Sequence, residues 1–129
     1  MTQTDAHAVF ILRLKQARKA MGLSQTALGI RMGIPEETAS ARINRYERGT
    51  SEPDLRTAEK IAKALNVSLS WLVCTDSRLA AAIESFSSLD AKTQEAFLLK
   101  LQAAAKKTKV KSPKPVAKKA IKKVTKTKR

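Results

Sequence analysis

The stretch from Leu23 to Gly49 constrains the fold most, because its end signals define two short helices joined by a sharp turn. Ser24 can accept a hydrogen bond from a free backbone N–H, so it is the expected N-cap of the first helix. Gly33 can end that helix, since glycine adopts the left-handed conformation at little steric cost. Pro35 is expected at the first position of the second helix, where its fixed φ is suited.

The second of these helices is predicted to have one buried side and one cationic side. The residues expected on the buried side are Ala39, Ile43, Tyr46 and Glu47. Those expected elsewhere on the helix are Thr38, Ala41, Arg42, Asn44, Arg45 and Arg48. Arginines mixed with short polar groups on an exposed helix face favour contact with a polyanion.

This pattern is typical of a helix-turn-helix, and the chain resembles the DNA-binding domains of lambdoid phage repressors and Cro proteins. The resemblance covers roughly residues 8 to 73 and rests on the segments LSQTALGIRMGI, INRYERG and SEPDLRTAEKIAKALNVSLSWL. It implies five helices, the third of which reads DNA. The stretch from Gly33 to Glu47 is four residues longer than the family pattern, which adds about one helical turn. Contacts are therefore transferred by counting back from Glu47.

The resemblance and the helix faces together imply base contacts in the major groove at Ser40, Ala41 and Arg45. Thr38 and Arg42 are further candidates, whose reach depends on where the extra turn lies. Arginine can bind guanine O6 and N7, serine and threonine can bind several bases, and an alanine methyl can contact the thymine methyl.

Phosphate contacts are implied for Gln25, which begins the first short helix, and expected for Arg48, Thr50 and Ser51 at the end of the second. The resemblance also implies an ion pair between Arg18 and Glu47. Such a pair would join the first helix of the domain to the DNA-reading helix.

The other helices of the domain are predicted from capping residues and apolar spacing. Asp5 is the expected cap of a helix that continues to about Met21, and Asn66 the expected stop of the fourth helix. The expected inward residues of these two helices are Phe10, Leu14, Ala17 and Met21, and Leu55, Ala58, Ile61, Ala62 and Leu65. Trp71 is expected in the core, His7 at the surface, and Cys74 as a small structural residue.

Residues 76–105 predict two more helices, separated near residues 87–90. Their apolar residues at helical spacing are Leu79, Ile83 and Phe86, and then Phe97, Leu98, Leu101 and Ala105. Two interpretations remain open. These helices pack back on the five-helix core, or they form a homodimer, which suits a protein that binds twofold-symmetric operators.

Positive charge is concentrated at the C-terminal end. The formal net charge is +15, and residues 106–129 hold eleven Lys and Arg129 without an acid, so 15 − 12 leaves +3 for residues 1–105. Pro113, Pro115 and charge repulsion predict a disordered tail. This tail resembles those of linker histones and is expected to bind phosphates through residues that include Lys118, Lys119, Lys122 and Lys123. A solubility tail is the alternative, and membrane binding is disfavoured because bulky apolar anchors are missing.

Several classes of function are not expected. The single Cys74 excludes an intramolecular disulfide, and with the single His7 it leaves too few ligands for an ordinary zinc site. The apolar run from Ala8 to Leu12 is too short for a signal peptide or a membrane span. We find no glycine-rich phosphate loop and no nucleophile–base pair at a persuasive spacing, so we expect no enzyme, cofactor or metal.

The sequence thus predicts an all-α protein with three parts: a five-helix helix-turn-helix domain over residues 5–74, a helical extension over 76–105 and a disordered tail over 106–129. We expect a transcriptional regulator, a repressor, that binds double-stranded DNA as a homodimer in the cytoplasm, at the nucleoid. One alternative is a nucleoid-associated DNA-binding protein. Another is the antitoxin of a toxin–antitoxin pair, whose toxin would contact residues 76–105.

Overall fold

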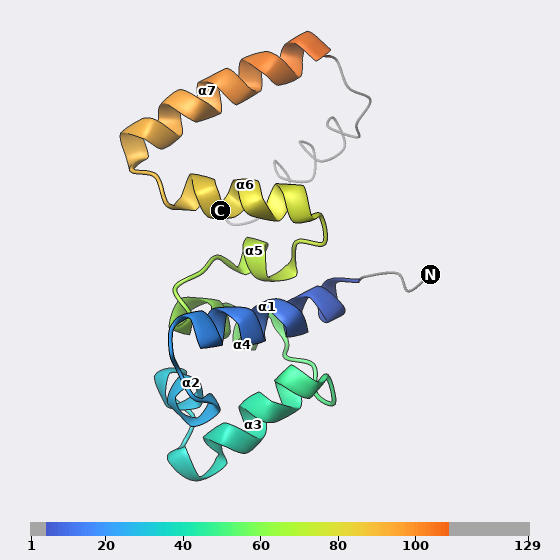
Figure 1. The fold of residues 1–129 in the computed structure, drawn as a ribbon, viewed down its shortest axis with the longest axis vertical. Coiled ribbons are helices and arrows are strands. Elements are labelled where there is room, and N and C mark those ends of the chain that lie inside the picture. Colours follow the sequence, from blue (N-terminus) through green and yellow to red (C-terminus); the bar gives the residue numbers. More distant parts are fainter. Residues whose placement is uncertain (1–4, 109–129) are drawn as a thin grey trace, which may run out of the picture. The chain divides into compact units, whose positions relative to one another are not determined.

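The computed structural model describes residues 5–108, which contain seven α-helices and no strand. In chain order these are α1 (Ala6–Ala20), α2 (Gln25–Arg31), α3 (Glu36–Arg48), α4 (Leu55–Ala64), α5 (Leu69–Val73), α6 (Ser77–Ser87) and α7 (Ala91–Thr108) (Figure 1). The all-α fold and the two helices after the five-helix domain are therefore as predicted.

The chain divides into two compact units between Leu89 and Asp90, so that α1–α6 belong to the first unit and α7 to the second. The helix α7 continues to Thr108, and Lys106 and Lys107 are therefore helical although the sequence predicted the tail to begin there. The rest of the predicted tail, with Lys118, Lys119, Lys122 and Lys123, lies outside the described residues. The predicted domain limits stay a prediction.

Local capping determines where the helices of the first unit begin. Asp5, Ser24 and Ser68 each accept a hydrogen bond from the backbone N–H three residues later, at 2.9, 2.9 and 3.0 Å. The caps at Asp5 and Ser24 were expected from the sequence. Pro35 differs from its prediction, because its ψ of 143° is extended and α3 therefore begins one residue later, at Glu36. Gly33, at φ +90°, makes the expected left-handed turn between α2 and α3.

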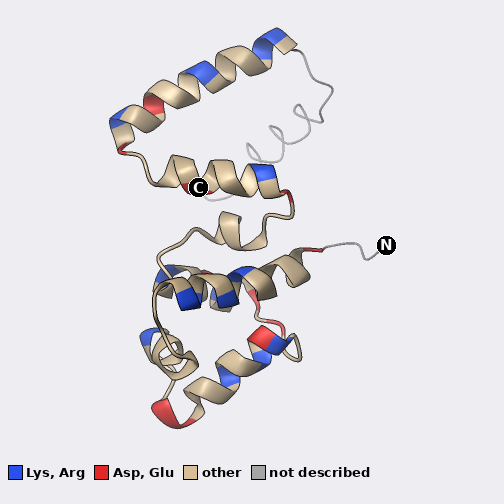
Figure 2. Ribbon diagram, in the orientation of Figure 1, with Lys and Arg blue, Asp and Glu red and all other residues tan. Residues whose placement is uncertain are grey.

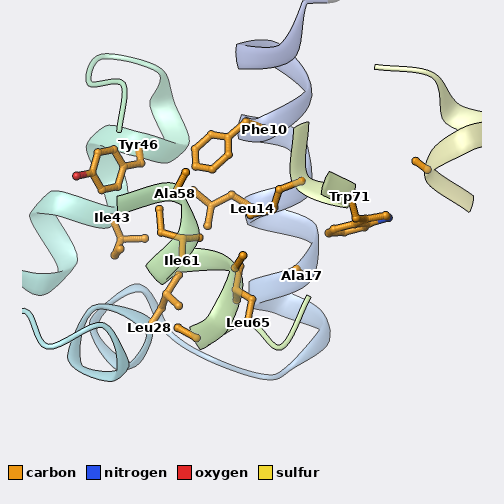
Figure 3. Close-up of a cluster of buried hydrophobic side chains, with 14 residues drawn as sticks. Phe10, Leu14, Ala17, Leu28, Ile43, Tyr46, Ala58, Ile61, Leu65 and Trp71 are labelled. Atoms are coloured by element: carbon orange, nitrogen blue, oxygen red, sulfur yellow. The ribbon is translucent and has the colours of Figure 1, made fainter. Parts of the chain in front are cut away.

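One aliphatic core joins the first five helices. Side chains from α1 to α5 meet in a single cluster (Figure 3). The largest fully buried side chains are Leu14, Leu28, Ile43, Ile61, Leu65 and Leu72. Trp71 is buried beside them, as predicted.

Three predicted positions are wrong. Met21 and Leu55 were expected on inner faces, but both are exposed, and Leu55 is 77% exposed. In their place Val9 and Ala64 are buried. One step along a helix rotates a side chain by about 100°, so spacing alone does not locate the centre of the contacting face. His7 was expected at the surface, but it is half-buried, and its Nε2 is buried without a hydrogen-bond partner among the described residues.

The two C-terminal helices differ in how they are covered. Within the first unit, Ala80 of α6 is buried and Ile83 packs against the same core, so α6 extends the five-helix domain. None of the described side chains of α7 is buried. Its apolar residues Phe97, Leu98 and Leu101 are exposed.

Candidate nucleic-acid interface

The helices α2 and α3 approach each other closely at Gly29. A Cβ placed on Gly29 would lie 2.5 Å from the Cβ of Ala39 and 3.0 Å from its Cα, which is closer than such atoms can pack. The missing side chain at Gly29 and the small one at Ala39 therefore allow the contact. This close approach fixes α3 against α2, and the exposed side of α3 faces outward.

The two sides of α3 are divided as the sequence predicted. Its buried residues are Ala39, Ile43, Tyr46 and Glu47. Its predicted base-contacting residues are all exposed: Thr38, Ser40, Ala41, Arg42 and Arg45. The charge also changes along the helix, since Glu36 and Glu37 occupy the first turn and arginines follow (Figure 2).

These exposed residues do not all point the same way. Ala41, Arg45 and Arg48 are spaced by four and three residues, so they form one row along the helix. Ser40 and Arg42 flank Ala41, each rotated by about 100° to one side or the other. The row and its flanks therefore form a convex surface, which is the shape a major groove admits.

A buried ion pair attaches α3 to α1. Arg18 Nε lies 2.5 Å from Glu47 Oε2, and Arg18 Nη2 donates to Glu47 Oε1 at 3.1 Å. The same guanidinium donates from Nη1 to the carbonyl of Leu23 at 2.9 Å, just before α2. The pair that the resemblance implied is thus present in the structure, and it connects α1, α3 and the start of α2.

Gln25 extends this polar network from α2 into α3. Its amide nitrogen donates to Glu47 Oε1 at 3.1 Å and to Asn44 Oδ1 at 3.3 Å. Its amide oxygen accepts a hydrogen bond from the hydroxyl of Ser40 at 3.4 Å. Sequence reasoning missed the part played by Asn44, because nothing in the local pattern shows which α2 residue faces it. The network holds Ser40, a predicted base-contacting residue, in a defined position.

The segment after α3 is shaped by the left-handed Gly49, at φ +79°. The backbone N–H groups of Thr50 and Ser51 both donate to the carbonyl of Arg45, at 3.1 and 3.3 Å. The Thr50 hydroxyl also donates to this carbonyl, at 3.3 Å. These bonds place the predicted phosphate-contacting residues Thr50 and Ser51 directly beside the end of α3, near the exposed Arg48.

A second arginine on α1 holds α5, and sequence reasoning missed it. Arg13 Nη1 donates to the carbonyl of Trp71 and, at 2.5 Å, to that of Cys74. Its guanidinium also lies 5.4 Å from the centre of the Trp71 ring, a cation–π distance. The contact spans about 60 residues of sequence, so no local signal marks it. Arg13 thus supplies donors to two carbonyls at the end of the short helix α5, and that of Trp71 also accepts a hydrogen bond from the backbone N–H of Cys74 at 3.4 Å.

Within residues 5–108, no three His, Cys, Asp or Glu side chains are grouped so that they could hold a metal ion. No helix in that range combines the length and apolar composition needed to cross a membrane.

The part of the chain that carries these residues matches a known protein family. The helix-turn-helix family profile matches residues 14–72. The chain is 29% identical over 100 residues to the transcriptional repressor RstR of the cryptic phage CTXphi from Vibrio cholerae, covering 74% of this chain and 86% of that protein. The crystal structure of the transcriptional regulator BswR matches with a TM-score of 0.67 and 38% sequence identity, covering 72% of this chain and 92% of that one.

The chain therefore belongs to the helix-turn-helix family of Cro and phage-repressor type, as its sequence motifs indicated. Within that class it is a DNA-binding transcriptional regulator, and its nucleic-acid partner is double-stranded DNA. Regulators of this family are typically not enzymes.

Proposed function

We propose that this protein is a sequence-specific repressor that inserts α3 into the major groove of double-stranded DNA and acts at the nucleoid. The separation of the two sides of α3 carries this proposal. Its apolar side and Glu47 are buried against the domain, whereas Ala41, Arg45 and their neighbours are exposed. A helix so held presents an arginine-rich surface in a rigid orientation, as base readout requires.

Each exposed residue has a role that follows from its chemistry. Arg45 is suited to bidentate binding of guanine, and the methyl group of Ala41 to contact with thymine. Ser40, held by Gln25, is a hydroxyl donor and acceptor for a base edge. Thr38 and Arg42 flank these residues and extend the contact to neighbouring base pairs.

Phosphate contacts at both ends of the helix-turn-helix would set its register on DNA. We assign them to Arg48, Thr50 and Ser51 after α3, and to Gln25 at the start of α2. Gln25 would exchange its longer donor bond, the 3.3 Å bond to Asn44, for a phosphate oxygen. The lysines of the tail, including Lys118, Lys119, Lys122 and Lys123, would add affinity without regard to sequence.

We propose further that the protein binds as a homodimer through α7. Phe97, Leu98 and Leu101 share one side of this helix and are exposed. Leu99 is exposed on the opposite side, about 150° from Phe97, Leu98 and Leu101 taken together. Leu101→Lys should give a monomer in sedimentation velocity, whereas Leu99→Lys, the matched control, should leave the dimer intact. A wild-type protein that is monomeric both alone and on DNA would exclude this part of the proposal.

The experiment that tests DNA reading is selection from a randomised duplex pool at two salt concentrations. Full-length wild type should select one sequence, and Arg45→Ala should relax the preference at one position per half-site. Arg56→Ala, an exposed arginine on α4, is the control and should leave the preference unchanged.

The tail is tested in the same assay. Replacing Lys118, Lys119, Lys122 and Lys123 by Gln should weaken binding to all sequences by the same factor. The slope of log binding constant against log salt concentration should become shallower by about 3 to 4. Selection of no sequence by the wild type, together with binding that depends on these lysines, would instead support a nucleoid-associated protein.

A further inference from the structure

We infer that Glu37 is an additional specificity-determining residue, which selects a cytosine at a base pair beyond the one that Ala41 contacts. This inference rests on the proposed function, because it requires α3 to lie in the major groove. It concerns the acidic first turn of α3, to which that function assigns no role.

The helix places Glu37 in line with the proposed base-contacting residues. Glu37, Ala41 and Arg45 follow one another at intervals of four residues, so neighbours in this series differ by only about 40° around the helix axis. All three are exposed. Any orientation that brings Ala41 and Arg45 to base edges therefore turns Glu37 toward the same groove. Its Cα lies about 6 Å farther along the axis than that of Ala41, which is close to two base-pair steps.

The carboxylate of Glu37 is available for such a contact. Among residues 5–108 the structure records one ion pair, between Arg18 and Glu47, and no hydrogen bond to the Glu37 side chain. An ionised carboxylate only accepts hydrogen bonds. In the major groove it therefore pairs well with the N4 amino group of cytosine. Guanine and thymine present only acceptors, which repel it, and adenine presents its N6 amino group beside the N7 acceptor.

Repulsion makes the selection sharper. A carboxylate that faces guanine, thymine or the adenine N7 instead of the cytosine amino group lies close to acceptors and phosphates, which costs binding free energy at incorrect sites. Glu37 would thus lower the affinity for most sequences while it favours the one that offers cytosine at its position. A positively charged residue there would raise the affinity for every sequence.

Glu36 provides a matched control within the same turn. It carries the same charge, is also exposed, and lies beside the same helix N-terminus. It is rotated by about 140° from Ala41, so it does not share the row. Both glutamates interact favourably with the positive end of the helix dipole, and their replacement by glutamine removes the same kind of contribution.

The test compares wild type, Glu37→Gln and Glu36→Gln, all full-length, in selection from a randomised duplex pool at one salt concentration. We expect the wild type to prefer cytosine at one position per half-site. Glu37→Gln should change that preference by at least about 5-fold and toward adenine, because glutamine can bond adenine N6 and N7. Glu36→Gln should keep the cytosine preference and change only the overall affinity. Far-UV circular dichroism melts of the three proteins show whether each is folded.

The remaining outcomes contradict the inference. If Glu37→Gln keeps the wild-type preference, Glu37 does not determine specificity. If Glu36→Gln shifts the preference equally, Glu37 acts through charge alone. Arg45→Ala in the same pool distinguishes failure of the proposed function from failure of this inference. If Arg45→Ala changes the base preference at one position while Glu37→Gln changes none, the proposed function is retained and the role of Glu37 is rejected. A wild type that selects no sequence rejects both.

Discussion

Removing the charge of Glu47 should destabilise the first unit strongly, and Glu47→Gln is the variant that isolates this effect. Glu47 is 5% exposed and Arg18 12% exposed, so water hardly reaches either charge. Glutamine has nearly the same volume and can still accept the hydrogen bond from Gln25, but it leaves the Arg18 guanidinium without an anion. Breaking a buried ion pair in this way costs about 3–5 kcal/mol.

This loss is large compared with the total stability. A domain of this size is stable by about 5–15 kcal/mol, and each kcal/mol changes Tm by about 4–8 °C. We therefore expect Tm, measured by circular dichroism, to fall by about 12–40 °C. The free energy of unfolding measured with urea should fall by the corresponding amount. Glu59→Gln, at an exposed position on α4, is the control and should change stability by less than about 0.5 kcal/mol.

The double variant Arg18→Met with Glu47→Gln tests the reason for the loss. Methionine removes the unpaired charge, so the double variant should be more stable than Glu47→Gln alone, because replacing both members of a buried pair is often close to neutral. A loss of under about 1 kcal/mol for Glu47→Gln would mean that the pair behaves like an exposed one, which would refute this reasoning.

Three further predictions concern packing, pH and capping. Gly29→Ala should cost about 1–3 kcal/mol in urea unfolding, because its methyl group would overlap Ala39. Arg13→Lys should lower Tm, since an ammonium cannot reproduce the planar fork that bonds the end of α5 and stacks on Trp71. Hydrogen bonds from the following turn lower the pKa of Asp54, so its stabilising effect is complete above about pH 4 and is lost as pH falls further. The stability difference between wild type and Asp54→Asn should accordingly shrink in acid.

The sequence alone determined the positions of the helices. Asp5 and Ser24 cap helices by accepting a hydrogen bond from a backbone N–H three residues later, and Gly33 ends a helix by its left-handed conformation. Such interactions involve only residues within one helical turn of each other, so they can be recognised in the sequence before any tertiary contact is known. The buried side of α3 was also predictable, because four residues there share a clear helical spacing.

Only the tertiary structure decided which side of the other helices is covered. Leu55 begins α4 and points to solvent, while the smaller Ala64 is buried near its end. Burial depends on where neighbouring helices pass, and this is a property of the whole arrangement rather than of a local spacing. The same reason explains why His7 was expected at the surface.

The candidate site also combines features that the sequence predicted with contacts that only the tertiary structure shows. The exposed row on α3 followed from its spacing, and the Arg18–Glu47 pair was implied by resemblance to a family. The contacts of Gln25 with Asn44 and Ser40 were not predictable, because they join residues 15 to 19 positions apart across two helices. Their geometry depends on how closely α2 and α3 approach, and the contact between Gly29 and Ala39 sets that distance.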